Sequence, residues 1–236
     1  MHPNTHYEHL ATLFDYPTRE YPRWVQSVYD LLAGRYVIAA AHIESLAQAL
    51  PSNGEPLSQE ALDEVQEIYT RSFEVQAITT LSVGYMMFGD DYKRGELLVN
   101  LKREQDQVGI DGGTELPDHL PNVLRLLARW EDQELVEEFV VEILHPALEQ
   151  MIEEFDVQRT AMRNELYRKH YKTLIVTSAE RGFMFRDPLE ALLRVLKADF
   201  DLGEYSPSQK DNDFLRNVQR ELEIEADERP PTAECM

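Results

Sequence analysis

Residues 81–98 read LSVGYMMFGDDYKRGELL, and residues 115–128 read ELPDHLPNVLRLLA. Each segment joins a loop of unusual composition to a stretch in which apolar residues recur every three or four positions, the period of an amphipathic helix. Gly89 stands where a helix is expected to end, because glycine adopts the positive φ of a C-terminal cap without strain. Pro117 and Pro121 restrict the loop before the second helix. Each segment therefore predicts a helix that is preceded or followed by a loop of restricted conformation.

The helical period extends over most of the chain, and no strand-like alternation of apolar and polar residues is found. Ser58 and Asp187 are predicted N-caps, and Pro188 is suited to the first helical position. The expected helical regions are residues 6–14, 22–50 with a bend at Gly34, 58–88, 90–107, 121–130, 133–144, 147–177 with a break near Asp156, and 188–200.

These patterns predict an all-α protein with a single-domain helical bundle. The domain is expected to cover residues 1–200. Residues 201–236 are expected to form an acidic, partly disordered tail, in which the spacing of Phe214, Leu215, Val218 and Leu222 predicts one short amphipathic helix.

The charge of the chain is its most unusual bulk property. Its 236 residues include 23 Lys and Arg against 44 Asp and Glu, a formal net charge of −21. Phosphate groups would be repelled, which argues against nucleic acid and against an anionic membrane surface as partners. A basic protein segment would instead be attracted. The alternative interpretation is that most of these carboxylates form a solvated surface that keeps the protein in solution.

Cysteine usage and the N-terminal sequence indicate a cytoplasmic protein. Cys235 is the only cysteine, so no intramolecular disulfide can form, and a catalytic thiol is not expected beside the terminus. The first residues lack the basic and then apolar pattern of a secretory signal. The sequence has no run of about 20 apolar residues that would span a bilayer, so membrane insertion is not expected.

The sequence offers little chemistry for an enzyme. Glu142 and His145 form a Glu-x-x-His pair with the spacing of di-iron helical bundles, but no second such pair exists and Pro146 follows directly. Residues 109–113, GIDGG, lack the strand and helix that flank a phosphate-binding loop. We expect no enzymatic activity and no resident metal or cofactor; a di-iron carboxylate enzyme that uses Glu142 and His145 is the alternative.

Two interpretations of residues 88–95, FGDDYKRG, remain open from the residues alone. In one, the segment is only a helix–helix corner, where Gly89 supplies a positive φ and Gly95 allows close helix packing. In the other, it is an exposed loop that contacts a partner. Asp90 and Asp118 are possible helix caps. His119 is either a pH-sensitive contact or an inert, partly exposed side chain.

Three segments together resemble a known family. Residues 73–95 pass through Leu81, Tyr85, Phe88-Gly89-Asp90 and Lys93-Arg94-Gly95; residues 115–121 read ELPDHLP; and residues 10–17 read LATLFDYP. This pattern, which covers roughly residues 7–200, resembles the nitrate reductase delta-subunit (NarJ-type) assembly chaperones, which are related to the TorD/DmsD group. Glu74, Met86 and Asp91-Tyr92 depart from the family pattern and suggest a branch that serves a relative of nitrate reductase.

The resemblance implies an all-helical cytoplasmic chaperone, monomeric or homodimeric, without catalytic residues. Such a protein binds the apo catalytic subunit of a nitrate-reductase-like molybdenum enzyme, often through its N-terminal peptide, and supports insertion of the molybdenum cofactor into that subunit. The alternative within this context is a permanent structural subunit of a redox complex. The motif positions imply that the client contacts Tyr85, Phe88, Asp90, Lys93, Arg94, Glu115, Asp118 and His119.

Overall fold

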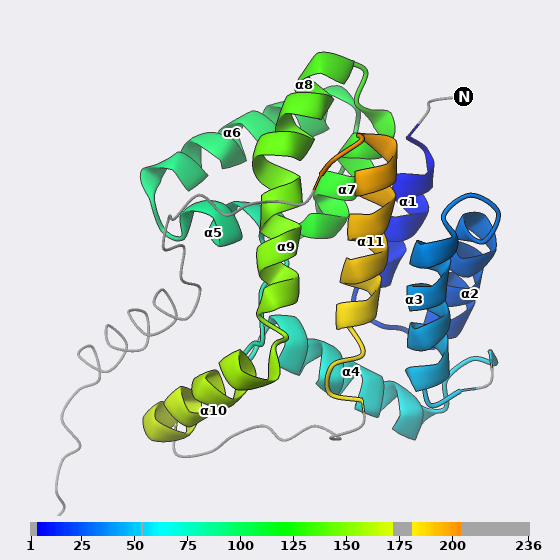
Figure 1. Ribbon diagram of the computed structural model, residues 1–236. Coiled ribbons are helices and arrows are strands. Elements are labelled where there is room, and N and C mark those ends of the chain that lie inside the picture. The colour runs from blue at the N-terminus through cyan, green and yellow to red at the C-terminus, as the bar shows by residue number, and fades with distance from the viewer. Residues whose placement is uncertain (1–3, 53, 172–180, 204–236) are drawn as a thin grey trace, which may run out of the picture.

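The computed structural model describes residues 4–52, 54–171 and 181–203 (Figure 1). Over these ranges all regular structure is helical, apart from one isolated antiparallel bridge between Ser82 and His119. The predicted all-α, single-domain fold is thus confirmed. The predicted helix in the acidic tail lies outside the described residues. Within the described ranges, no helix combines the length and the apolar character needed to cross a bilayer.

The N-terminal part of the chain forms two short elements and a helical hairpin. The elements are α1 (His6–Ala11), the 3₁₀ turn η1 (Thr12–Phe14), α2 (Tyr21–Leu32) and α3 (Val37–Ala49). The prediction of one bent helix over residues 22–50 is wrong, because the chain reverses between α2 and α3. Tyr36, with φ −119° and ψ 64°, is outside the helical region at the start of α3. α3 then packs along α11 (Arg186–Asp199) (Figure 1).

Helix α4 (Gln59–Phe73) begins as predicted, since Ser58 Oγ accepts a hydrogen bond of 3.2 Å from the Ala61 N–H. Its predicted continuation to residue 88 is wrong. The chain turns back after Phe73, where Gln76 has a φ of +49°, and the N–H of Ile78 donates to the Arg71 carbonyl at 3.1 Å. The next helix, α5 (Val83–Phe88), therefore covers only the end of the expected region.

Helices α5 and α6 (Tyr92–Gln107) form the corner that the glycine pattern predicted. Gly89 follows α5 with a φ of +58°, as expected for the stop residue. The N-cap of α6 is Asp91, whose carboxylate accepts from the Lys93 N–H at 2.9 Å, whereas Asp90 was one predicted cap. Helix α7 (Leu120–Arg129) follows the loop that contains Pro117, and Pro121 lies in its first turn.

One long rod of helix follows α7. It consists of α8 (Gln133–Phe139), the π-helical turn η2 (Val140–Leu144) and α9 (His145–Glu153). Pro146 lies in the first turn of α9, and the wider π turn precedes it, where the missing proline N–H would interrupt α-helical bonding. The predicted break near Asp156 is confirmed, because this residue caps α10 (Val157–Tyr171) by accepting from the Gln158 N–H at 2.9 Å.

Helix α11 starts near the predicted position but with a different cap. Phe185 is the N-cap, and Asp187 lies in the first turn, where its carboxylate accepts from Ser45 Oγ at 2.7 Å. The side chain therefore joins α11 to α3 instead of capping its own helix.

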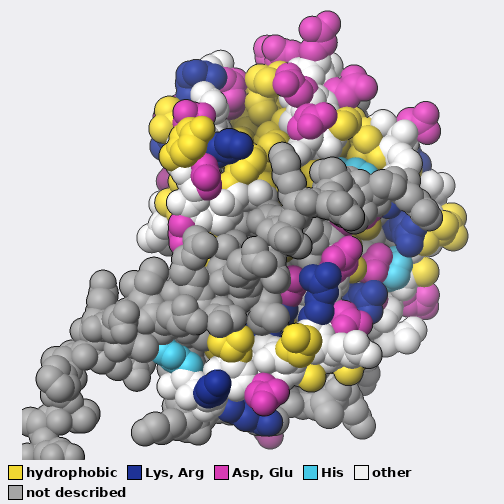
Figure 2. All heavy atoms as spheres, turned by 60° about the vertical axis from the view of Figure 1, so that its left-hand side comes forward, with side chains coloured by type: hydrophobic (Ala, Val, Ile, Leu, Met, Phe, Trp, Pro, Cys, Tyr) yellow, Lys and Arg dark blue, Asp and Glu magenta, His cyan; other side chains and the backbone are white. Residues whose placement is uncertain are grey.

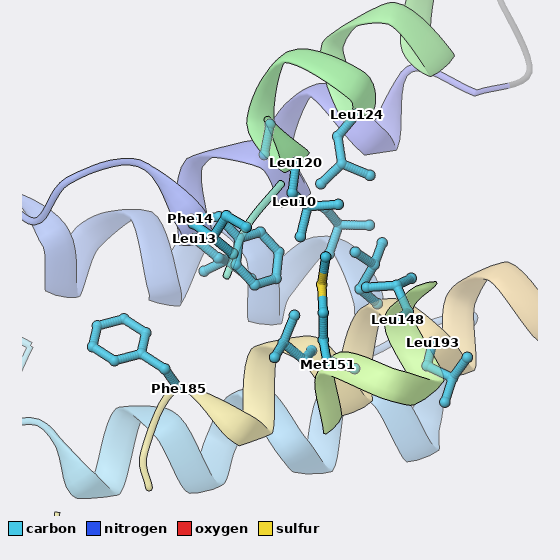
Figure 3. Packing of buried hydrophobic residues seen from close by; sticks show 14 of the residues in the cluster. Leu10, Leu13, Phe14, Leu120, Leu124, Leu148, Met151, Phe185 and Leu193 are labelled. Carbon is cyan, nitrogen blue, oxygen red and sulfur yellow. The ribbon is translucent and has the colours of Figure 1, made fainter. Parts of the chain in front are cut away.

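The core forms where α1, α7, α9 and α11 meet (Figure 3). The labelled side chains of Figure 3 are all buried: Leu10, Leu13, Phe14, Leu120, Leu124, Leu148, Met151, Phe185 and Leu193. Burial of each such side chain contributes about 1.5–3 kcal/mol. Helix α7 is thereby fixed against α1, and this contact positions the loop that precedes α7.

Candidate functional site

The two segments that stood out in the sequence are joined by main-chain hydrogen bonds. The Leu120 N–H donates to the Leu81 carbonyl at 2.8 Å, and the Val83 N–H donates to the Asp118 carbonyl at 2.9 Å. These bonds flank the antiparallel bridge between Ser82 and His119. The start of α5 and the start of α7 therefore form a single rigid unit, although they are more than 30 residues apart in the sequence.

A buried ion pair supports this unit from within. Asp118 is fully buried, and its Oδ2 accepts from Arg94 Nε at 3.1 Å. The Arg94 guanidinium lies 5.2 Å from the centre of the Tyr85 ring, a cation–π contact, and its Nη1 is 3.9 Å from the exposed Asp90. Asp118 is therefore neither a cap of α7 nor accessible to a partner, contrary to both sequence predictions.

Gly84 allows this arrangement, and Gly95 does not have the packing role that one interpretation of the sequence gave it. A Cβ at Gly84 would lie 2.8 Å from Asp118 Oδ2, whereas a Cβ at Gly95 would meet nothing within 4 Å. We expect Gly84→Ala to destabilise the protein by about 1–2 kcal/mol, because the ion pair must shift. Gly95→Ala, the matched control, should stabilise it by roughly 0.5–1 kcal/mol through helix propensity. Chemical denaturation measures both; a stabilising Gly84→Ala would refute this packing.

A cavity of about 540 Å³ opens beside the bridge. Its walls come from segments that are distant in the sequence. They are the residues after η1 (Asp15, Tyr16), the end of α4 (Tyr69, Phe73, Glu74), the chain before α5 (Thr80, Leu81, Ser82), the loop after α6 (Asp111, Gly112, Gly113, Glu115) and the start of α7 (His119, Pro121, Asn122, Arg125). We refer to this site as the acidic cavity.

The charges around the acidic cavity favour a cation. Four carboxylates line it, those of Asp15, Glu74, Asp111 and Glu115, against the single guanidinium of Arg125. That guanidinium is already paired, because Arg125 Nη2 lies 2.5 Å from Asp15 Oδ2. The remaining carboxylates give the cavity an excess of negative charge that attracts a positively charged group.

Aromatic rings form another part of the wall. Tyr16 and Tyr69 meet edge to face with their centroids 5.3 Å apart, and Tyr69 packs in the same way on Phe73 at 5.2 Å. The Tyr69 hydroxyl donates to the Phe14 carbonyl at 2.8 Å, so this ring is held in place. Rings beside carboxylates suit the alkyl chain and charged end of lysine or arginine.

His119 is half-buried in the wall. Burial lowers the pKa of its imidazole below the ordinary value of 6.5, although Glu115, Asp118 and Asp15 act in the opposite direction. The ring is therefore uncharged at neutral pH, with one nitrogen that donates and one that accepts. Such a ring can hydrogen-bond to a peptide backbone without repelling a cation.

This lowered pKa has a consequence for stability. The unfolded chain, where the histidine has its ordinary pKa, binds more protons than the folded chain, so stability falls as the pH drops below about 6.5. We expect His119→Gln to lose less stability than the wild type between pH 7.5 and pH 5.5. Thermal unfolding at both pH values measures the difference, and an equal loss in the two proteins would contradict it.

The residues predicted to contact a partner separate into groups. Glu115 and His119 line the acidic cavity. Tyr85, Arg94 and Asp118 form the ion-pair cluster, with Asp90 at its exposed edge. Half-buried Phe88 and exposed Lys93 belong to neither group.

The sequence did not identify Asp15, Tyr16, Tyr69, Asp111 and Arg125 as site residues. Some of them lie within the sequence motifs that carry the family resemblance. Asp15 and Tyr16 fall within LATLFDYP, and two further wall residues, Phe73 and Glu74, begin the central motif. The three segments that carry the family resemblance thus converge on one cavity, which their separate positions in the sequence could not show.

The pair proposed for a di-iron site is not arranged as one. Glu142 is exposed, whereas His145 is buried, with its Nε2 at 3.1 Å from Glu149 Oε1. The same Glu149 oxygen accepts from Lys197 at 2.6 Å. In the described part of the chain, no group of three or more His, Cys, Asp or Glu side chains is placed to hold a metal ion.

The site is thus an acidic, partly aromatic cavity with a rigid wall, and all three segments noted in the sequence contribute to it. Its residues offer hydrogen bonds, charge and aromatic surface to a ligand. The chain matches no protein-family model, no curated protein and no solved structure.

Proposed function

We propose that this protein is a cytoplasmic chaperone for the immature catalytic subunit of a nitrate-reductase-like molybdenum enzyme. It binds the subunit before the molybdenum cofactor is inserted and keeps it competent for insertion and assembly. The supporting observation is that residues 10–17, 73–95 and 115–121, the three segments that resemble NarJ-type chaperones, all contribute to one acidic cavity.

The proposed ligand of the acidic cavity is a basic segment of the client, such as its N-terminal peptide. A volume of about 540 Å³ suits one or two side chains, so the cavity would anchor a lysine or arginine while the rest of the segment lies outside. The net charge of −21 would speed the encounter with a basic segment. Phe88, Asp90 and Lys93 remain proposed contacts for the part of the client outside the cavity.

The rigid wall contributes to affinity in this proposal. The loop that carries Glu115 and His119 is fixed by the bridge at Ser82 and by the Arg94–Asp118 pair. Less conformational freedom is therefore lost when the client binds. No bond is made or broken by the chaperone; its work is selective binding of an unfinished polypeptide.

Affinity capture tests the proposal. The tagged full-length protein is purified from cells in which molybdenum cofactor synthesis is blocked, and the co-purifying proteins are identified by mass spectrometry. We expect the apo catalytic subunit of a molybdenum enzyme, and no chaperone in the mature enzyme. Retention of the chain in the mature complex would indicate a structural subunit. Stoichiometric iron or manganese in the purified chain would favour the di-iron enzyme.

A further inference from the structure

Helix α10 is a basic element on an acidic protein. It contains four basic residues and one acidic residue, a net charge of +3 with His170 neutral, whereas the whole chain carries −21. The helix projects from the lower end of the bundle (Figure 1). Figure 2 shows basic, hydrophobic and acidic side chains together in this lower region, whereas acidic side chains predominate at the top.

One face of α10 is attached to the domain. Arg163 pairs with Glu154 in the interior, and the Tyr167 hydroxyl donates to the Ala77 carbonyl at 3.2 Å. Both side chains are buried, with exposed fractions of 1% for Arg163 and 5% for Tyr167. These contacts fix the orientation of the helix, and they determine which residues face the solvent.

The other face carries exposed apolar side chains and more cations than carboxylates. Val157 and Met162 are exposed by 69% and 59%, and Ala161 between them is also exposed, so the three form a small apolar patch. Glu165 is exposed on the same face, and Arg168 and Lys169 are exposed about one turn beyond it, so cations outnumber carboxylates there by two to one. We call these residues the outer face of α10. An apolar stripe that ends in two cations fits an amphipathic segment with acidic residues.

The C-terminal tail contains such a segment. Residues 211–228 include seven acidic and two basic residues, a net charge of −5. Phe214, Leu215, Val218 and Leu222 recur at helical spacing, so apolar and acidic residues fall on the same short stretch. Its charge and its apolar pattern therefore complement the outer face of α10.

The tail is attached beyond Gly203, after the end of α11. Helix α11 has 14 residues and rises about 21 Å from the lower end of the bundle towards Gly203 (Figure 1). Residues 204–210, which precede residues 211–228, can span roughly 23 Å when extended, about the length of α11. The tether also gives the segment an effective concentration on the order of millimolar, so a weak contact is populated.

We propose that residues 211–228 dock on the outer face of α10 of the same chain. The apolar stripe covers Val157 and Met162, and the acidic residues pair with Arg168 and Lys169. This contact does not involve the acidic cavity, so a test of the docking does not depend on the proposed function.

Disulfide trapping in the full-length chain tests the docking. Cys235 is first replaced by serine, which leaves a cysteine-free protein. Met162→Cys with Val218→Cys should then form an intramolecular disulfide at least tenfold faster than Val99→Cys with Val218→Cys. Val99 is the matched control, because it is 69% exposed on another helix, α6. Mass spectrometry of the monomer measures the rate.

Charge reversal provides the second readout. Arg168→Glu with Lys169→Glu should slow the Met162–Val218 disulfide at least tenfold, whereas Lys102→Glu with Arg103→Glu on α6 should leave it unchanged. Circular dichroism checks that each variant remains folded. Equal trapping rates at positions 162 and 99, or no effect of the α10 reversal, would overturn the proposal. Disulfides between two chains instead of within one would also overturn it, and would assign the face to a second copy.

Discussion

Replacing Asp199 by alanine should destabilise the protein by about 3–5 kcal/mol, which is the usual cost of breaking a buried charged cluster. The carboxylate ends α11 and accepts four hydrogen bonds from the N-terminal part of the chain. Its Oδ1 accepts from Tyr36 at 2.5 Å and Arg35 at 2.9 Å, and its Oδ2 bonds to His6 at 2.7 Å and Tyr7 at 3.0 Å. Its removal leaves these groups without their acceptor in a largely buried site.

The melting temperature should accordingly fall by roughly 10 °C, and thermal unfolding measures this directly. Asp199→Asn should cost less, because one acceptor oxygen remains. Asp30→Ala on α2 is the matched control; this residue is exposed and accepts one hydrogen bond, from Gln26 at 2.9 Å. It should change stability by less than about 0.5 kcal/mol. Similar losses for Asp199→Ala and Asp30→Ala would show that the cluster does not hold the termini of the domain together.

The same carboxylate gives a pH dependence of known sign. Burial raises the pKa of Asp199, but the bonds from His6, Tyr36 and Tyr7 outweigh it and lower the pKa below the ordinary value of 3.8. The stabilisation is therefore complete above pH 3.8 and is lost as the pH falls through the lower value of the folded protein. Asp199→Asn should lack this part of the acid sensitivity.

Reversing two charges of the acidic cavity should weaken client binding at least 100-fold. The variant is Glu74→Lys with Glu115→Lys; both side chains are exposed and line the cavity, so the fold should persist. Each lysine repels a basic client segment where a carboxylate attracted it, and a loss of about 2.7 kcal/mol corresponds to this factor. Binding of the immature subunit captured with the wild-type protein measures the effect.

The matched control for this variant is Glu137→Lys with Glu138→Lys on α8. It changes the net charge equally and lies on an exposed face outside the cavity. We expect less than a threefold change in affinity. If both pairs of substitutions weakened binding equally, attraction by the overall charge would explain the interaction, and the cavity would lose its role. Asp118 is unsuitable for such a test, because its substitution would break a buried ion pair.

Local sequence signals predicted the helices well wherever a helix end is determined by nearby residues. Ser58 and Asp156 cap helices through bonds that span two or three residues, and Gly89 stops α5 with its own backbone. The predicted helix ends and caps were wrong where contacts between residues distant in the sequence determine them. The chain at residues 74–82 turns towards residues 118–120, and no local period reports this pairing. Asp187 likewise bonds to Ser45 instead of its own helix.

The candidate site was only partly predictable, because contacts between distant residues also determine which side chains it contains. The sequence pointed to Glu115 and His119, but it also pointed to Asp118, which proved to be fully buried. Exposure depends on the partner that packs above a residue, here Arg94 from another helix. The convergence of residues 15–16, 73–74 and 115–125 on one cavity is a property of the fold, so it could not be inferred from the segments one at a time.

Photo-crosslinking from the rim of the acidic cavity tests the central claim most directly. A photoreactive amino acid replaces Tyr16, a cavity residue that is 48% exposed, or Val37, which is 71% exposed on α3 and does not line the cavity. We predict that the Tyr16 variant crosslinks to a basic segment of the immature molybdenum-enzyme subunit and that the Val37 variant does not. Crosslinks from Val37 alone, or from Tyr16 only to the mature enzyme, would contradict the proposed role of the cavity.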